Sequence, residues 1–254
     1  MPVMRHIAIA FAAFASAAPA AAQDSALAFS LTGGARVAPS YFGASGTSTT
    51  PTFGFGFGGL RFGGVELGDP DAPMLFAPGA GLRGAFRYIP EREGRNELAG
   101  LNDVDAALEL GLGLHYTADL WQVYADLRYG AVGHKGLTAE AGANLIYRTD
   151  SGLVLHGGPR AEFGSSQFTN SYFGVTGAES LASGLGAFTA SGGVYSVGLE
   201  LGAYQPLGDT WGITGLLRYD RLRGDAAQSP ITQQGSRDQI SAEIGLTRHF
   251  NLRF

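Results

Sequence analysis

Four histidines could serve as bases for nucleophilic catalysis in this chain, namely His115, His134, His156 and His249. A nucleophile needs such a base within hydrogen-bonding reach, and the base needs a third group that orients it. Serines are available along the chain, but no motif brings one of them to a histidine. The sequence therefore predicts no catalytic residue, and we expect a protein that is not an enzyme.

The sequence also contains no motif for binding a metal, a cofactor or a nucleic acid. No pair of histidines has the spacing of metal ligands on a helix or a hairpin. No glycine-rich stretch is followed by the helix that a phosphate cradle needs. The formal net charge of −5 is unfavourable for contact with a polyanion. We expect no metal site, no cofactor and no nucleic-acid partner.

Charged side chains that alternate with apolar ones are the most distinctive chemical pattern. Leucines occupy 108, 110, 112 and 114, whereas Glu109 and His115 share the other parity with glycines. Successive side chains of a strand point to opposite faces, so this segment has one apolar face and one polar face. Arg36, Arg83, Arg87 and Asp220 also have the polar parity of their segments. The ten candidate inward-facing charged residues are Glu109, Asp126, Arg128, Glu140, Arg148, Arg160, Glu162, Glu200, Arg218 and Glu243.

The alternation recurs down the chain and predicts an all-β protein, a transmembrane up-and-down antiparallel β-barrel. We expect about ten strands, with twelve as the alternative if the segment 53–89 holds two more. Tyr195 is expected on the lipid face, and Arg248 is expected near a membrane interface that its long side chain can reach. The predicted strands are 29–39, 52–64, 81–89, 105–116, 120–132, 137–148, 153–163, 194–204, 211–220 and 239–254.

Tight and long connections alternate between these strands. The links 117–119, 149–152 and 207–209 are tight, whereas 90–104, 164–193 and 224–237 are long. Outer-membrane barrels have short periplasmic turns and longer extracellular loops, so the pattern also predicts the orientation. In the loop 164–193, Tyr172 and Phe173 are expected to anchor their own loop by packing.

Two roles remain open for the polar face. Eight strands leave an interior just filled by side chains, so ten or twelve strands allow at most a narrow pore. Charges of both signs in such an interior would pair, because unpaired charges away from bulk water are costly. One alternative is therefore a structural network of mutually neutralising charges. The other is a selectivity filter in a narrow channel for small polar solutes.

The N-terminal residues have the pattern of a signal peptide. Arg5 gives a positive start, residues 7–18 are apolar but too few to span a bilayer, and Ala20-Ala21-Ala22 offers a cleavage site. The sequence predicts a cleaved signal peptide over 1–22 and a single barrel domain over 23–254. A terminal Phe254 that closes an amphipathic strand resembles the assembly signal of outer-membrane barrels.

Several short motifs, spread in order over nearly the whole mature chain, carry a resemblance to a known family. They are VAPSYFGAS at 37–45, GLNDVD at 100–105, GHKGL at 133–137, YFGV at 172–175 and SPIT at 229–232. In these motifs the chain resembles the MipA/OmpV family of outer-membrane proteins, named after an MltA-interacting protein. It departs from the family pattern at Phe42, where an acidic residue is expected.

The resemblance implies a location in the outer membrane of a Gram-negative cell. It also implies a scaffold of the cell envelope, associated with a peptidoglycan lytic transglycosylase and a peptidoglycan synthase. Other members are described as surface antigens, adhesins or small-solute channels, so a narrow channel or a surface adhesin stays as the alternative. The family provides no site residue that could be carried over to this chain.

Overall fold

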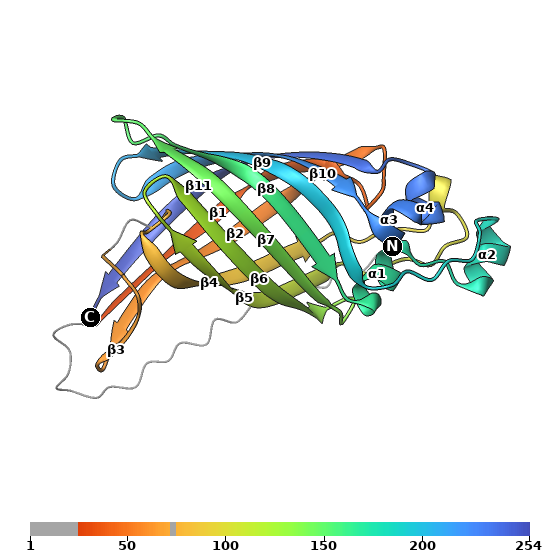
Figure 1. The fold of residues 1–254 in the computed structure, drawn as a ribbon, viewed down its shortest axis with the longest axis horizontal. Helices are drawn as coiled ribbons and strands as arrows, with labels where there is room; N and C mark the ends of the chain where they lie inside the picture. The colour runs from red at the N-terminus through yellow and green to blue at the C-terminus, as the bar shows by residue number, and fades with distance from the viewer. Residues whose placement is uncertain (1–24, 72–74) are drawn as a thin grey trace, which may run out of the picture.

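Eleven antiparallel strands form one sheet that curls into a nearly closed barrel in the computed structural model (Figure 1). The structure describes residues 25–71 and 75–254, so the predicted signal peptide over 1–22 lies outside the described residues. The strands are β1 (Ala26–Pro39), β2 (Thr47–Phe62), β3 (Val65–Gly68), β4 (Gly79–Ile89), β5 (Ala107–Thr117), β6 (Trp121–Val132), β7 (Leu137–Arg148), β8 (Val154–Gly164), β9 (Gly193–Leu207), β10 (Trp211–Leu222) and β11 (Asp238–Arg253).

The prediction of an antiparallel barrel is confirmed, and ten of the strands correspond to the ten predicted segments. The additional strand, β3, has four residues and forms a short hairpin with the end of β2. It lies in the stretch 53–89, in which the alternative of twelve strands requires two more. Among its described residues, that stretch contributes one short strand beyond β2 and β4.

The order of strands in the sheet is β3-β2-β1-β11-β10-β9-β8-β7-β6-β5-β4. The first long strand therefore pairs with the last, and Ala26 lies opposite Arg253. The order ends at the short β3 and at β4, and β2, the long strand next to β3, lies beside β4. Here the rings of Phe55 and Phe86 meet with their centroids 5.8 Å apart. Within the described residues no backbone ladder joins β2 to β4, so this seam is held by side chains.

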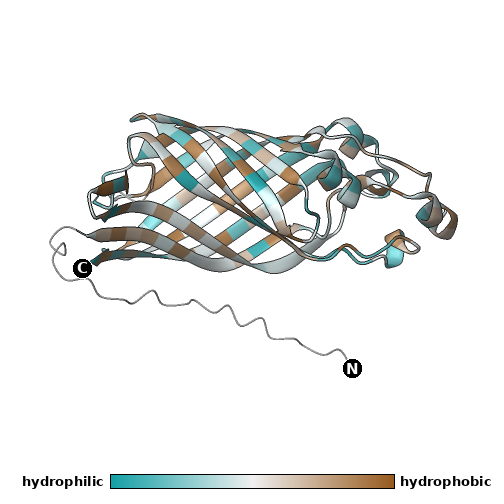
Figure 2. Cartoon of the chain, turned by 90° about the horizontal axis from the view of Figure 1, so that it is seen from below, coloured by the Kyte–Doolittle hydropathy of each residue, from teal (hydrophilic) through white to brown (hydrophobic). Residues whose placement is uncertain are grey.

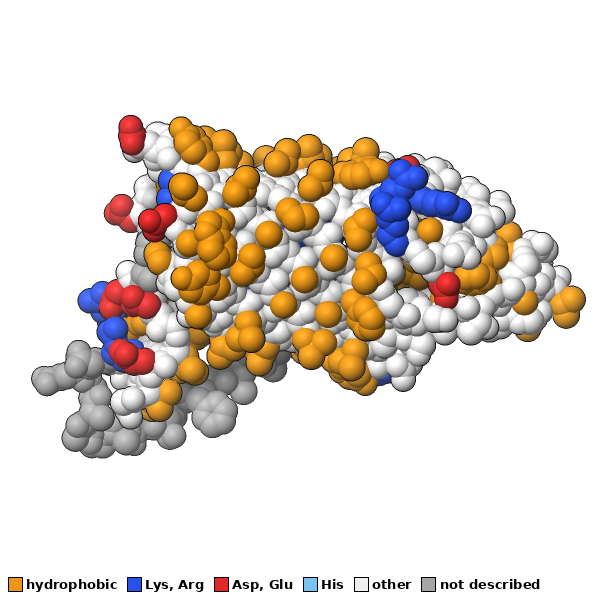
Figure 3. Space-filling view, viewed as in Figure 1, with side chains coloured by type: hydrophobic (Ala, Val, Ile, Leu, Met, Phe, Trp, Pro, Cys, Tyr) orange, Lys and Arg blue, Asp and Glu red, His pale blue; other side chains and the backbone are white. Residues whose placement is uncertain are grey.

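The outer surface of the barrel is apolar, as the alternation predicts. In β6 the exposed side chains of Trp121, Val123 and Leu127 alternate with the buried side chains of Gln122 and Asp126. Figure 2 shows the same alternation of hydropathy along the strands, and Figure 3 shows apolar side chains distributed over the barrel wall. None of the described helices is long and apolar enough to cross a membrane.

The two ends of the barrel differ, and we call them the turn end and the loop end. Tight turns follow β5, β7 and β9 at the turn end, where β1 begins and β11 finishes. The predicted long connections lie at the loop end, where they carry short helices (Figure 1). These are η1 (Asn96–Leu98), α1 (Ser166–Phe173), α2 (Gly177–Ser183), α3 (Gly224–Gln228) and α4 (Pro230–Gln233).

Tyr195 corrects the predicted parity of β9. It was expected on the lipid face, but its side chain is buried in the interior together with that of Ser196. The register of β8 and β9 shifts between Glu162 and Phe163, so that Glu162 pairs with Ser196 and Phe163 with Val194. This bulge leaves Tyr195 as the extra residue and turns its ring inward.

Candidate functional site

A network of ion pairs crosses the barrel interior, and we call it the ionic layer. Five arginines and six carboxylates belong to it, which makes its formal charge −1. Most of its members lie in the halves of their strands nearer to the loop end. The members are Arg83, Arg87, Glu109, Asp126, Arg128, Glu140, Arg160, Glu162, Glu200, Arg218 and Asp220.

Several of these ion pairs join strands that are not neighbours. The guanidinium of Arg218 on β10 lies 3.2 Å from Glu140 on β7 and 3.0 Å from Glu162 on β8. Arg87 on β4 lies 3.4 Å from the same Glu162. Three strands separate β4 from β8 in the sheet, and two separate β10 from β7. These contacts therefore run across the bore of the barrel.

Glu109 is the most enclosed carboxylate of the ionic layer, with 0% of its surface exposed. Arg87 donates two hydrogen bonds to its two oxygens at 2.7 and 2.8 Å, and Arg128 donates a third at 3.2 Å. His134 lies 3.0 Å from the carboxylate through Nε2, while its Nδ1 accepts the backbone N–H of Gly136. An accepting Nδ1 assigns the proton to Nε2, so a neutral imidazole donates to Glu109.

Aromatic rings and imidazoles lie over glycines of the neighbouring strand in the remaining interior. His115 lies opposite Gly81, Tyr124 opposite Gly142, and His156 opposite Gly202. A Cβ atom at any of these glycines would lie within 3 Å of the facing ring. The inward glycines thus provide the space in which these rings lie against the barrel wall.

An apolar cluster of loop residues and strand ends closes the loop end above the ionic layer, and we call it the loop cap. Phe168 and Phe173 of α1 are fully buried, and the ring of Phe168 lies 5.0 Å from that of Tyr195. The cap contacts the ionic layer directly, because Arg87 donates to the hydroxyl of Tyr195 at 2.7 Å. Its members are Phe42, Ile89, Val104, Ala107, Phe168, Tyr172, Phe173, Phe188, Ala190, Tyr195, Leu222, Ala226 and Ala227.

Phe42, the departure from the family pattern, lies inside this cap. Its ring is 5.1 Å from that of Tyr172 and 5.8 Å from that of Phe173. The expectation that Tyr172 and Phe173 anchor their own loop agrees with their burial here. An apolar ring at 42 is compatible with this environment, whereas a carboxylate would be desolvated in it.

Phe188 packs against both the loop cap and a second small cluster of Leu98, Leu101, Val175 and Ile231. The buried Arg92 also contacts the loop cap. Its guanidinium donates to the carbonyl of Tyr172 at 2.8 Å, and burial lowers the pKa of Arg92. Burial likewise raises the pKa of Tyr41 to about 12, with the nearby Glu97 carboxylate acting in the same direction. Several loops are therefore packed into one body at this end.

Two of the ten predicted inward charges lie outside the ionic layer. Arg148 lies at the turn end, where it donates to the carbonyl of Asp119 at 2.7 Å and to that of Phe76 at 3.2 Å. Glu243 lies opposite Arg36 in the register, but no ion pair includes it among the described residues. The other eight belong to the layer. Sequence reasoning also missed His134 and Tyr195, since one lies in a loop and the other follows a bulge.

The connection into β4 reaches the interior from the turn end. The ring of Phe76 lies 4.9 Å from that of His156, and Phe76 has a positive φ of 56°. Asn251 of β11 donates to the carbonyl of Pro70 at 2.9 Å, at the beginning of the same connection. The side chain of Phe76 thus occupies part of the turn-end opening.

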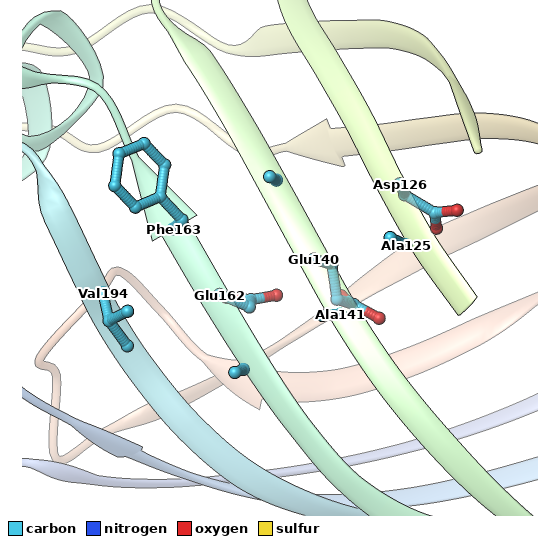
Figure 4. A pocket seen from close by; sticks show the side chains of 9 residues that line it. Ala125, Asp126, Glu140, Ala141, Glu162, Phe163 and Val194 are labelled. Carbon is cyan, nitrogen blue, oxygen red and sulfur yellow. The ribbon is translucent and has the colours of Figure 1, made fainter. Parts of the chain in front are cut away.

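A hollow of about 210 Å³ lies on the outer, lipid-facing side of the barrel wall (Figure 4). Ala125, Ala139, Ala141 and Ala161 line it on three neighbouring strands. These alanines have the outward parity, and Ala125 and Ala161 both lie opposite Ala141. The hollow is therefore a shallow depression in the lipid-facing surface, where small side chains replace the leucines and aromatics found elsewhere.

The polar groups of the interior bind mainly to one another. Within the described ranges no serine hydroxyl is hydrogen-bonded to a histidine; His249 instead lies 2.6 Å from the hydroxyl of Tyr204. No group of three or more potential ligands that could hold a metal ion occurs in the part of the chain that the structure describes. The ion pairs of the ionic layer connect strands across the interior, and the loop cap covers the interior at the loop end.

Several known proteins are similar to this chain in sequence. The family model described as "MltA-interacting protein MipA" matches residues 31–250. The outer membrane protein Omp26La of Vibrio anguillarum is 27% identical over 61% of this chain and 59% of its own length. The MltA-interacting protein of Escherichia coli (strain K12) is 35% identical over 39% of this chain and 40% of its own length. The chain therefore spans less than two thirds of these relatives.

Among solved structures, an outer membrane channel from Pseudomonas putida F1 is similar, with a TM-score of 0.48 and 10% identity. The match covers 92% of this chain and 100% of that one. The sequence relatives of this family are named outer membrane proteins, and this protein is located in the outer membrane. The family match extends over most of the chain, and the chain belongs to the MipA family of outer-membrane β-barrels.

Proposed function

We propose that this protein is a non-enzymatic, non-conducting scaffold of the cell envelope, which holds peptidoglycan enzymes at the inner surface of the outer membrane. The observation that carries the proposal is the ionic layer, because Arg218 and Arg87 bridge strands across the bore. A channel needs a continuous wet path, and paired side chains across the bore oppose one. The loop cap supports the same conclusion.

The partner class follows from the name of the Escherichia coli relative, MltA-interacting protein. We infer a peptidoglycan lytic transglycosylase as the first partner and a peptidoglycan synthase as the second. Such partners would meet the turn end, which faces the periplasm. Exposed Asp119, Asp150 and Asp209 lie at the tips of three turns there, and Figure 3 shows acidic side chains at this end. A partner with a basic surface would complement them.

Two measurements test the proposal. In planar bilayers the purified, folded protein should show no discrete conductance steps, and steps of regular size would favour the narrow channel. In the second, a tagged protein should retrieve a lytic transglycosylase from detergent extracts of the envelope. Replacing Asp119, Asp150 and Asp209 by asparagine should reduce the retrieval. The matched control neutralises the exposed Glu91, Glu93 and Asp105 at the loop end and should leave it unchanged.

A further inference from the structure

Three exposed arginines lie together at the loop end of β10 and β11, and we call them the arginine rim. Arg221 and Arg223 share the outward parity of β10, so their Cα atoms are about 7 Å apart. Arg237 lies beside them, because its carbonyl accepts the backbone N–H of Leu222 at 2.8 Å. All three side chains are exposed. Arg221 and Arg223 therefore lie on one face, and Arg237, which pairs with the inward-facing Leu222, lies at the adjacent edge of the neighbouring strand with an exposed side chain.

The arginine rim lies directly above the apolar belt of the same strand. Trp211, Ile213, Leu217 and Tyr219 are exposed at the outward positions of β10, and Arg221 follows Tyr219 at the next outward position. Aromatic residues mark the interface at both edges of an outer-membrane barrel. Figure 3 shows basic side chains gathered at the loop-end edge of the apolar surface. The rim therefore stands at the level of the lipid headgroups.

Two carboxylates lie nearby, and each is engaged. Asp238 accepts the hydroxyl of Tyr219 at 2.6 Å and lies 3.6 Å from Arg221. Asp225 accepts the backbone N–H of Ser191 at 2.7 Å. Neither Arg223 nor Arg237 has an ion pair or a side-chain hydrogen bond with any described residue. Their donors are available to a ligand from outside the chain.

Arg61 and Arg253 at the turn end are paired with carboxylates. Arg61 lies 2.6 Å from Glu66 and 3.3 Å from Asp71, and Arg253 lies 2.8 Å from the same Asp71. These two arginines are neutralised within the chain and provide a matched control. The exposed Arg248, near the same end, has no ion pair among the described residues and lies over the rings of Trp211 and Phe250.

We propose that Arg221, Arg223 and Arg237 bind the phosphate of an anionic lipid headgroup in the leaflet that surrounds the loop end. The planar guanidinium donates paired hydrogen bonds to phosphate oxygens, and clustered arginines are suited to this anion. The apolar side chains of β10 below the rim would contact the acyl chains of the same lipid. The ligand is therefore a lipid and not a free anion, since both of its parts meet a matching surface.

The test compares two probes on the folded protein in detergent micelles. One is a diphosphorylated lipid A and the other is the same lipid without its phosphates. Native mass spectrometry measures how much of each lipid the protein retains. The wild type should retain the phosphorylated lipid preferentially. In R221Q/R223Q/R237Q the ratio of phosphorylated to unphosphorylated lipid retained should fall about tenfold, because charge-assisted hydrogen bonds are removed. R61Q/R253Q should retain the wild-type preference.

Folding of each variant is checked by its heat-dependent shift on a gel. If the triple variant does not fold, Arg223→Gln replaces it, since the Arg223 side chain has no described partner whose loss could disturb the barrel. Equal retention of both lipids by the wild type, or full preference in the arginine variant, would overturn the proposal. Arginine-dependent binding of inorganic phosphate, without preferential retention of the phosphorylated lipid, would also overturn it.

Discussion

Glu109 is the carboxylate on which Arg87, Arg128 and His134 converge. Replacing Glu109 by glutamine removes the negative charge and leaves the buried Arg128 and the largely buried Arg87 with a neutral amide. Breaking a buried ion pair by removing one partner costs about 3–5 kcal/mol. We expect the free energy of unfolding to fall by this amount in urea titrations in detergent, with Trp121 and Trp211 as fluorescent reporters.

Glu243→Gln is the matched control for this measurement. The carboxylate of Glu243 has the same inward parity but no ion pair among the described residues. Its loss should change the free energy of unfolding by less than about 1 kcal/mol, which is typical of a weakly coupled charge. Equal losses in the two variants would mean that the ionic layer does not depend on Glu109.

Most of the charges with polar parity lie in the interior, and the residues that depart from the parity pattern have physical reasons to do so. Arg148 has the inward parity, but it lies at the end of β7, where its side chain turns to the carbonyls of neighbouring turns. Tyr195 follows a bulge, which shifts parity by one residue. His134 lies outside any strand, so its contact with Glu109 depends on a loop that folds inward.

The helix α2 should lose its N-terminal cap when the solution is acidified. Burial alone would raise the pKa of Glu179, but the bonds that it accepts from the Thr176 side chain and from the backbone N–H groups of Thr176 and Asn102 lower it. A lowered pKa contributes stability above the ordinary pKa of a glutamate. This contribution is lost as the pH falls through the lowered value.

Amide hydrogen exchange, corrected for the intrinsic effect of pH, measures this change. Protection of the α2 amides should decrease at acid pH in the wild type. Glu179→Gln should decrease it already at neutral pH, because the reciprocal capping box of Thr176 and Glu179 is weakened. Unchanged protection in Glu179→Gln at neutral pH would contradict the role of the carboxylate.

The long strands, whose sequences alternate with a strict period of two, could be predicted from the sequence, and the short helices of the loops could not. The long strands expose an apolar face to lipid along their whole length, so the alternation is continuous and strong. The loop helices have three to eight residues each. A helix this short shows too few turns for a period of 3.6 to be visible. Their formation depends on the packing of Phe168 and Ile231, which sequence reasoning cannot foresee.

For the molecule as a whole, the ionic layer should block conduction even when the loop cap is opened. Phe168→Ala/Tyr172→Ala removes two rings of the cap, and the ion pairs across the bore remain. This variant should show no conductance steps in planar bilayers. Adding Arg87→Ala and Arg218→Ala removes the bridges and should produce conductance. Conductance steps in Phe168→Ala/Tyr172→Ala, without the arginine substitutions, would mean that the loop cap and not the ionic layer closes the bore.

The position of β11 in the sheet has a consequence for biosynthesis. It pairs with β1 on one side and β10 on the other, whereas β2 and β4 meet without a ladder among the described residues. A premature stop before residue 238 would thus split the hydrogen-bonded wall into an N-terminal three-stranded piece and a seven-stranded remainder. Each would present bare strand edges to other nascent chains, which favours aggregation or degradation. Completion of the wall must wait until translation has delivered its final sixteen-residue strand.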